Sequence, residues 1–193
     1  MTEDALTEPG GAGAAGPRAS GNPTAAPGAG TLLRLLRDGR PRTRSELASV
    51  TGLARSTVTQ RVDALLAGGL IGPAGEAVST GGRPPTTFSF RPEARVVLAA
   101  DLGATHARLA LTDMSGTVLA EDRADLDIAL GPEPVLDWVV EHGLALLDAA
   151  GRGTDELLGL GMGLPGPVEH SAGRAVNPPI MPGWDHFDVS GHV

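Results

Sequence analysis

The stretch TRSELASVTGLARSTVTQRVDALLAGGL, residues 43–70, decides the fold of the first part of this chain. It predicts two short helices joined by a tight turn, the first of them over residues 43–50. Thr43 and Glu46 have the spacing of a capping box, in which the hydroxyl accepts an amide hydrogen of the first turn and the carboxylate reaches back to the capping residue. Gly52 then lets the chain leave this helix in a left-handed conformation without straining a side chain.

The second helix of this stretch is predicted to begin near Ala54 or Arg55 and to have two different faces. Its apolar stripe repeats at helical spacing and consists of Val58, Val62, Leu65 and Leu66. The opposite face carries Arg55, Ser56, Thr59, Gln60 and Arg61, with Thr57 at its edge. Donors and acceptors at the start of such a helix are typical of a recognition helix in the major groove of DNA. The alternatives are a solvated helical hairpin and a polar face that binds another protein.

The flanking segments extend this pattern. Residues 31–39 (TLLRLLRDG) predict a preceding helix with its leucines on one side. After the second helix we expect a hairpin made of a strand, a turn and a strand over 77–79, 80–85 and 86–90. Helix, helix-turn-helix and hairpin in this order predict a winged helix-turn-helix domain over residues 31–92.

The tip of the predicted wing reads GGRPP at residues 81–85. Glycines let a backbone approach closely and prolines hold it extended, so Arg83 is presented on a slim loop. An arginine there suits a narrow minor groove, where negative potential is focused; the alternative is a plain turn that contains an arginine. The predicted DNA contacts are Arg44, Arg55, Ser56, Thr57, Thr59, Gln60, Arg61 and Arg83.

Charge is distributed unevenly along the chain. The net charge is −8, but residues 31–95 contain ten arginines against five acidic residues, and residues 96–193 contain four against fifteen. A locally basic segment is the electrostatic footprint of phosphate contact, and the acidic remainder keeps that contact one-sided. Double-stranded DNA is therefore the predicted partner. An adaptor that docks a protein through the same basic face is an open alternative.

Composition argues against several other classes of protein. Residues 1–30 are mostly Gly, Pro and Ala, so a disordered tail is expected there. The chain has no cysteine, and its five histidines form no paired motif, so neither disulfides nor a metal site is expected. The N-terminus lacks the features of a secretory signal, and the apolar run 157–168 is too short to span a bilayer. We expect a cytoplasmic protein without membrane contact.

From residue 96 the pattern changes to an antiparallel meander, with strands predicted over 96–102, 107–112 and 117–123. The first turn carries Asp101, Gly103 and Thr105. A carboxylate there can hold hydrated Mg²⁺, a glycine lets amides face phosphate oxygens, and a hydroxyl adds a donor. These residue types are also common in ordinary turns, so the motif gains meaning only from the strands that follow it.

A helix and a further strand follow the meander. Pro132 or Pro134 suits the first turn of the helix, and Gly151 suits the position after its end. The predicted buried stripe of this helix is Val135, Val139, Leu146 and Leu147. In the next strand Leu158, Leu160, Met162 and Leu164 are expected on one face and three glycines on the other. A glycine face lets another element or a ligand approach the backbone closely, and close packing of a helix is the expected cause. Meander, helix and strand make an incomplete α/β unit.

Four segments in this order resemble the ROK family of repressors, open reading frames and kinases. They are RSTVTQRVDALLAGGLI, GGRPP, DLGATHARLALTDMSG and GMGLPGPVEHSAGRAVNPPIMPGWDHFDV, and the resemblance covers nearly everything from residue 31 onward. It implies a chain of α+β and α/β type, in which the winged helix is followed over 93–193 by part of an actin-like (ribonuclease H-like) sugar-kinase lobe. Asp101, Gly103 and Thr105 then match a phosphate loop. Gly166 and Asn177 lie in segments that border the sugar cleft.

The chain departs from the family pattern in three places. Ala104 and His106 stand where the kinases often have Gly and Lys, and Ala54 stands where a capping Ser is frequent. The sequence stops at Val193, before the loop with the family's catalytic Asp, the Cys/His zinc site and the second lobe. We therefore expect a fragment with a vestigial phosphate loop, no catalytic residue, and no zinc or other cofactor.

The resemblance implies a sequence-specific transcriptional regulator, a repressor of sugar-metabolism genes. A sugar or sugar phosphate is the implied effector, with weak or lost binding in this partial lobe, and a homodimer is expected for the full-length form. The alternative is a glucokinase-like sugar kinase fused to a DNA-binding module, inactive here because phosphoryl transfer needs a base and a closed cleft. Weak binding to single half-sites is expected, because the body that sets the half-site spacing is missing from this sequence. An exposed glycine-faced strand and an unfinished sheet also predict poor solubility.

Overall fold

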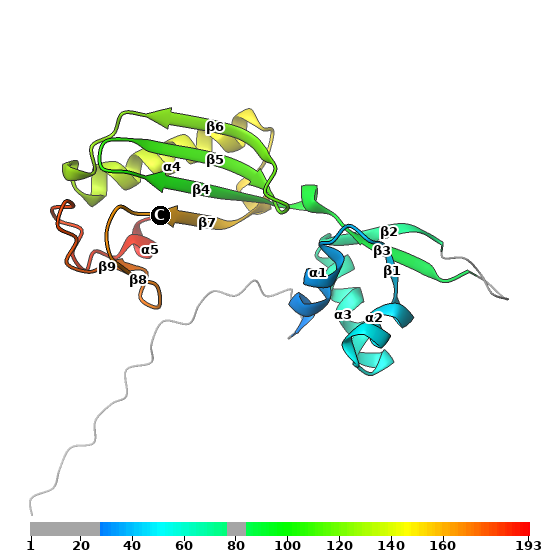
Figure 1. Cartoon of the computed structure of the whole chain (residues 1–193). Coiled ribbons are helices and arrows are strands. Elements are labelled where there is room, and N and C mark those ends of the chain that lie inside the picture. Colours follow the sequence, from blue (N-terminus) through cyan, green and yellow to red (C-terminus); the bar gives the residue numbers. More distant parts are fainter. Residues whose placement is uncertain (1–27, 77–83) are drawn as a thin grey trace, which may run out of the picture.

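The computed structural model describes residues 28–76 and 84–193 of the chain (Figure 1). Two parts follow one another: a small helical part with a hairpin, and a larger part built on a four-stranded sheet. This succession confirms the predicted fold class. The disorder expected for residues 1–27 and the wing tip with Arg83 lie outside the described residues.

The first part is a winged helix-turn-helix. Its elements are α1 Ala29–Leu36, β1 Arg42–Thr43, α2 Arg44–Thr51, α3 Arg55–Ala67, β2 Ile71–Glu76 and β3 Thr86–Phe90. The three strands form an antiparallel sheet in the order β1-β3-β2. Side chains no more than 3% exposed form its core: Ala29, Leu32, Leu36, Leu47, Val58, Val62, Leu65, Ile71 and Phe88. The stripe predicted for the second helix is therefore core, apart from Leu66, which is only partly buried.

Several elements in this part differ from the prediction. α1 begins at Ala29, inside the segment assigned to the tail. The first wing strand follows Leu70 directly as β2, whereas the strand predicted over 77–79 falls outside the described residues. No pattern in the sequence predicts β1, because two residues carry no period. It forms because Arg42 and Thr43 pair with β3.

The capping signals of the helix-turn-helix are confirmed. The Thr43 hydroxyl accepts the N–H of Glu46 at 3.2 Å, and Glu46 Oε2 accepts the N–H of Thr43 at 2.7 Å. Gly52 ends α2 with φ 69°, in the left-handed region. α3 starts after Ala54, whose side chain makes no capping hydrogen bond. Local sequence therefore sets the turn between α2 and α3.

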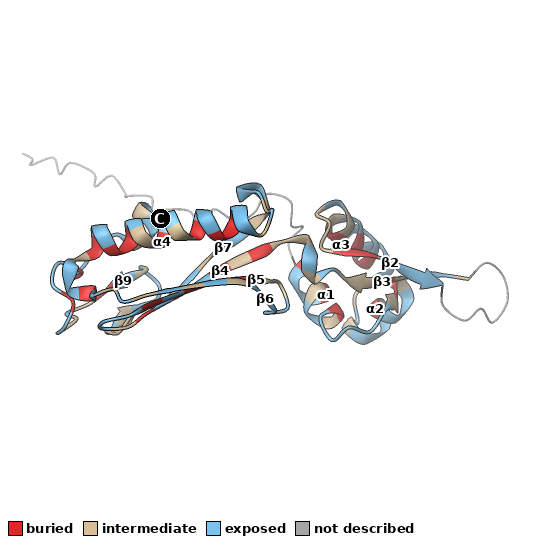
Figure 2. Ribbon diagram, turned by 90° about the horizontal axis from the view of Figure 1, so that it is seen from above, coloured by how far each residue is buried: buried red, intermediate tan, exposed pale blue. Residues whose placement is uncertain are grey.

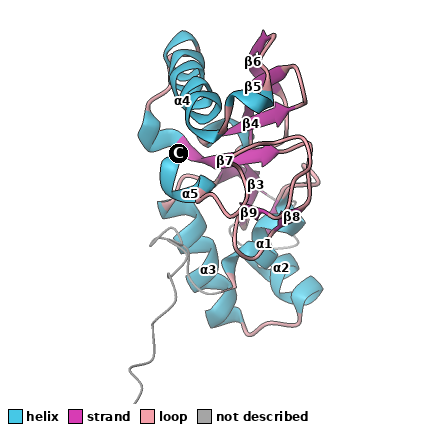
Figure 3. Ribbon diagram, turned by 90° about the vertical axis from the view of Figure 1, so that its left-hand side faces the viewer, coloured by secondary structure: helices cyan, strands magenta, loops and turns pink. Residues whose placement is uncertain are grey.

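The second part is a four-stranded sheet with one long helix along one face (Figures 2 and 3). Its main elements are β4 Val96–Leu102, β5 Ala107–Asp113, β6 Val118–Ala124, α4 Pro132–Ala149, β7 Leu157–Gly163, β8 Val168–Glu169, β9 Arg174–Ala175 and α5 Val189–His192. Single 3-10 turns lie at η1 Pro92–Ala94, η2 Ile128–Leu130 and η3 Thr154–Glu156. The strand order is β6-β5-β4-β7, and only the β4–β7 pair is parallel because α4 carries the chain across the sheet.

Alternate residues of β4 and β5 pack against α4 to form the core of this part. The α4 side chains in it include the whole predicted stripe: Val135, Val139, Leu146 and Leu147. The strand side chains include Val96, Leu98, Leu109 and Leu111. Trp184 is fully buried, and its Nε1 donates to the carbonyl of Ile128 at 3.2 Å. This bond connects the segment after β9 to the turn that directly precedes α4. None of the helices in the described ranges is long and apolar enough to cross a membrane.

β7 differs from the strand that its sequence predicts. Leu158 is 46% exposed, while Leu157, Leu160, Met162 and Leu164 pack against the core. The pairing with β4 shifts register between Leu157 and Leu160, so an irregularity turns Leu158 away from the other leucines. A Cβ atom at Gly161 would meet no heavy atom within 4 Å. The expected close packing of a helix on the glycine face is therefore wrong for the described residues.

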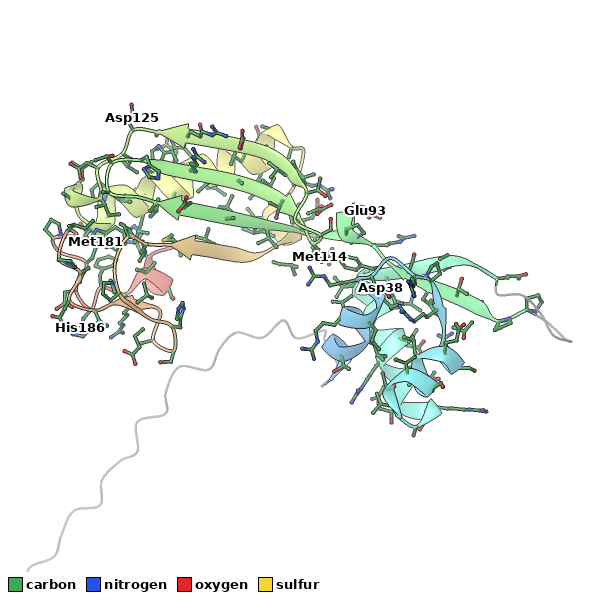
Figure 4. The ribbon with its side chains drawn as sticks, viewed as in Figure 1. Asp38, Glu93, Met114, Asp125, Met181 and His186 are labelled. Atoms are coloured by element: carbon green, nitrogen blue, oxygen red, sulfur yellow. The ribbon has the colours of Figure 1, made fainter. Side chains whose placement is uncertain are left out.

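The two parts meet where β3 continues through η1 into β4. The N–H of Met114 donates to the carbonyl of Pro92 at 3.0 Å, and Arg37 Nη2 donates to the carbonyl of Met114 at 3.3 Å. Figure 4 shows Met114 and Glu93 at this junction. The turn after β5 therefore contacts both the connection and the helical part.

Candidate nucleic-acid interface

α3 presents a row of exposed polar side chains. The row consists of Arg55, Ser56, Thr59 and Gln60. It lies opposite Val58 and Val62, whose side chains are fully buried in the domain core. Because the buried valines fix the rotation of the helix, these donors and acceptors point to solvent in the first two turns of α3. This is the arrangement that reads base edges in a major groove.

The N-terminus of α3 is open. Ala54 has φ −58° and ψ 144° and supplies no side-chain acceptor for the amide groups of the first turn. Helix N-termini carry free N–H groups and the positive end of the helix dipole, both of which attract anions. A DNA phosphate is an acceptor of the right kind for this end of the helix.

Thr57 and Arg61 do not belong to the exposed row. Both are only partly exposed. The guanidinium of Arg61 lies beside the residue that precedes α1, since a Cβ atom at Gly28 would come within 2.5 Å of Arg61 Nη2. Arg61 therefore contacts the start of α1, which differs from the prediction that it shares a face with Arg55 and Gln60.

Arg44 also has protein partners. Its Nη2 donates to Asp63 Oδ1 on α3 at 2.7 Å, and its guanidinium carbon lies 4.6 Å from the centre of the Phe88 ring on β3. Its side chain is 38% exposed. The residue predicted as a direct DNA contact thus joins three elements of the domain.

Acidic side chains of the basic segment are engaged in hydrogen bonds. Arg42 Nη2 lies 2.6 Å from Asp38 Oδ2, and this guanidinium holds the pKa of the Asp38 carboxyl well below its usual range. The backbone N–H and then the hydroxyl of Thr43 lower the pKa of Glu46 by donating to its carboxylate. Asp63 forms an ion pair with Arg44. Three acidic side chains of this segment therefore bind groups within the domain. The exposed arginines then contribute a positive electrostatic potential at the surface.

Of the predicted phosphate-loop residues, Asp101 lies near the end of β4, and Gly103 and Thr105 lie in the turn between β4 and β5. Asp101 and Thr105 are exposed, and the N–H of Gly103 donates to the carbonyl of His106 at 2.8 Å. A Cβ atom at Gly103 would overlap the His106 imidazole. The His106 imidazole therefore lies directly beside Gly103.

The residues predicted to border a sugar cleft lie in the segment after β7. A Cβ atom at Gly166 would lie 3.0 Å from Pro178 Cβ and from Met181 Sδ, so Gly166 packs against the residues just after Asn177. Asn177 has φ 45°, and its N–H donates to Asp185 Oδ1 at 2.8 Å. The structure thus brings Gly166 and the Asn177 loop together.

Hydrogen bonds connect this segment to the turn after β4. The carbonyl of Ala104 accepts the N–H of Ile128 at 3.0 Å, and the carbonyl of Ile128 accepts Trp184 Nε1. Met181 and His186 mark the segment in Figure 4. The two groups of predicted residues therefore gather at the carboxyl ends of the parallel strands β4 and β7, where open α/β sheets bind ligands.

Fold and site together define a winged helix-turn-helix protein in which an actin-like α/β lobe follows the DNA-binding fold along the chain. In a comparison with known families, residues 31–71 match a family described as winged helix-turn-helix DNA-binding, and residues 97–193 match the ROK family. The chain belongs to the ROK family. The predicted resemblance is confirmed.

Curated relatives and a solved structure agree with this assignment. The xylose repressors of Bacillus subtilis (strain 168) and Bacillus spizizenii (strain ATCC 23059 / NRRL B-14472 / W23) are 27% and 25% identical over 162 residues, which is 84% of this chain and 41% of each relative. A ROK family transcriptional regulator, described as a homolog of the E. coli MLC protein, matches with a TM-score of 0.69 at 20% identity, over 85% of this chain and 41% of that one. It shares the fold. The chain spans about two-fifths of the length of these relatives.

Proposed function

We propose that this chain is a sequence-specific DNA-binding transcriptional regulator that represses sugar-metabolism genes. The observation that carries the proposal is the exposed polar row of α3 at an uncapped helix N-terminus, within a winged helix-turn-helix domain. The names of the xylose repressors support the repressor role and the sugar context. In this proposal Arg55, Ser56, Thr59 and Gln60 face the major groove and Arg83 in the wing reaches the adjacent minor groove.

The second part is proposed to bind the effector in the full-length form. A sugar or sugar phosphate would enter between the turn after β4 and the segment with Gly166 and Asn177, and a homodimer would set the spacing of two half-sites. Sugar phosphorylation is a weaker candidate, because the N–H of Gly103 already donates to the carbonyl of His106 and the His106 imidazole lies beside this glycine. Regulation by DNA binding is therefore preferred over kinase activity.

The test is selection of a preferred duplex by the full chain, followed by titration of that duplex and a scrambled one. Gln60→Ala is expected to relax the preference at one base pair by about 1–3 kcal/mol, because a side chain that reads a base edge is lost. Arg108→Ala is a control outside the proposed interface, since Arg108 is exposed on β5 in the second part. It removes one positive charge outside the proposed interface and should leave the preference unchanged.

Salt titration separates DNA binding from an adaptor role. A domain that neutralises several phosphates loses affinity with a slope of about −0.9 per phosphate contact on a plot of log affinity against log salt concentration. Selection that enriches no duplex, with equal and shallow binding to preferred and scrambled DNA, would overturn the proposed function.

A further inference from the structure

Arg44 is the first residue of α2 and contacts both other elements of the candidate interface. It pairs with Asp63 on α3 at 2.7 Å, and its guanidinium stacks on Phe88 of β3 at 4.6 Å from the ring centre. A planar guanidinium can form an ion pair through its edge while its face covers an aromatic ring. One side chain thus links the helix-turn-helix to the strand that leads out of the wing.

The backbone on which Arg44 sits is itself fixed. The two residues before it form β1, in which Arg42 pairs with Phe88 and Thr43 with Thr87. Thr43 also starts α2 through the capping box. The side chain of Arg44 therefore leaves from a point that is fixed to β3 and reaches toward α3.

Burial of Arg44 Nε indicates that the guanidinium is drawn inward. This nitrogen is buried and has no hydrogen-bond partner among the described residues. An exposed arginine normally keeps its polar end in water, and leaving an N–H buried without a partner costs free energy. The ion pair and the ring contact must offset this cost. An arginine that extended into solvent to contact a phosphate would keep its Nε accessible to water and would not incur this cost.

We propose that Arg44 is a positioning residue that fixes recognition helix α3 relative to the wing strands β2 and β3. The proposal rests on the proposed DNA-binding function, and it replaces the prediction that Arg44 contacts DNA directly. A helix in the major groove and a wing in the next groove engage together only at one angle and spacing. Asp63, on the exposed side of α3, is the partner through which Arg44 sets that geometry.

Removing the Asp63 charge separates positioning from simple electrostatics. Asp63→Asn removes a negative charge from the DNA-binding domain, so electrostatics alone predicts tighter binding. Positioning predicts the opposite, because the amide holds the guanidinium less strongly. We expect binding to the preferred duplex to weaken by about tenfold, in the range of coupling between contacting residues. We also expect a shallower salt dependence, which shows that contacts made by other residues are lost.

Two further variants complete the experiment on the full chain. Arg44→Lys keeps the positive charge but loses the planar group that stacks and pairs, so it should weaken binding by a similar factor. Glu76→Gln is the matched control, because Glu76 is an exposed acid on β2 that makes no ion pair within the described ranges. It should leave binding unchanged or make it slightly tighter. Thermal melting by circular dichroism confirms that each variant is folded.

The outcomes distinguish this inference from the proposed function. If the wild-type chain prefers no duplex, the proposed function fails first. If the wild-type chain binds its duplex while Asp63→Asn binds equally or more tightly with an unchanged salt dependence, the positioning role of Arg44 is overturned. Non-additive losses in the Arg44→Lys/Asp63→Asn double variant would support it. Asp63→Asn remains informative if Arg44→Lys fails to fold, since the Asp63 side chain is 58% exposed.

Discussion

Ala54→Ser is expected to stabilise the winged helix-turn-helix part. Ala54 is exposed, holds the extended conformation of an N-cap residue, and gives α3 no side-chain acceptor. A serine at this position accepts an amide hydrogen of the first turn, which is worth about 1 kcal/mol. For a part of this size, about 1 kcal/mol raises the melting temperature by roughly 4–8 °C. The same substitution should weaken DNA binding, because the capped amide is no longer available to a phosphate.

The two parts can be followed separately during melting. Both tryptophans, Trp138 and Trp184, lie in the second part, and the chain has no tyrosine. Tryptophan fluorescence therefore follows the second part, while calorimetry or circular dichroism detects both. The expected result is a higher midpoint for the transition that fluorescence does not detect, with the fluorescence midpoint unchanged.

Ala67→Ser is the matched control for this prediction. It places the same side chain at an exposed position at the C-terminal end of the same helix, where there is no free amide to cap. Serine is a weaker helix former than alanine by roughly 0.5 kcal/mol, so the control should melt slightly lower. If Ala54→Ser melts at or below the wild-type temperature, the reasoning about the uncapped N-terminus is refuted.

Three other predictions concern stability, pH and solubility. Trp184→Phe should lower the free energy of unfolding of the second part by about 1–3 kcal/mol, because it removes the Nε1 donor to the carbonyl of Ile128 and makes a fully buried side chain smaller; an unchanged urea midpoint would contradict this. The pKa of Glu46 is lowered in the folded state by hydrogen bonds from Thr43, so its contribution to stability is complete above the ordinary pKa of 4.5 and is lost as pH falls below that value. The melting temperature of Glu46→Gln should therefore fall less than that of the wild type between neutral and acid pH, and parallel curves would reject this assignment. Leu158→Thr should raise the soluble concentration of the chain without changing its melting temperature, since Leu158 is 46% exposed on an edge strand; equal solubility in a precipitation assay would count against it.

Local signals in the sequence were sufficient for much of the fold. Thr43, Glu46 and Gly52 set the ends of α2 through contacts within a few residues, so their pattern predicts the observed geometry. The apolar stripe of α4 is likewise periodic, and its residues are buried as predicted. The exposed row of α3 follows from the same period, because valines on one face leave the polar side chains on the other.

Contacts between distant residues decided what the sequence did not. The two-residue strand β1 exists only because β3 lies beside it. The irregularity that exposes Leu158 arises from its pairing with β4.

At the candidate interface, the polar face of α3 could be predicted from the sequence, whereas the contacts of the interface arginines with other elements could not. The sequence predicts which side chains of α3 are exposed, because the helical period alone assigns each side chain to one face of the helix. Whether Arg44 and Arg61 are free for a ligand depends on Asp63 and Gly28, which contact them from other elements of the domain. Periodicity carries no information about such meetings, because they depend on how whole elements pack. The sequence by itself therefore determined which surface could recognise DNA, and only the tertiary structure decided which of its arginines hold that surface together.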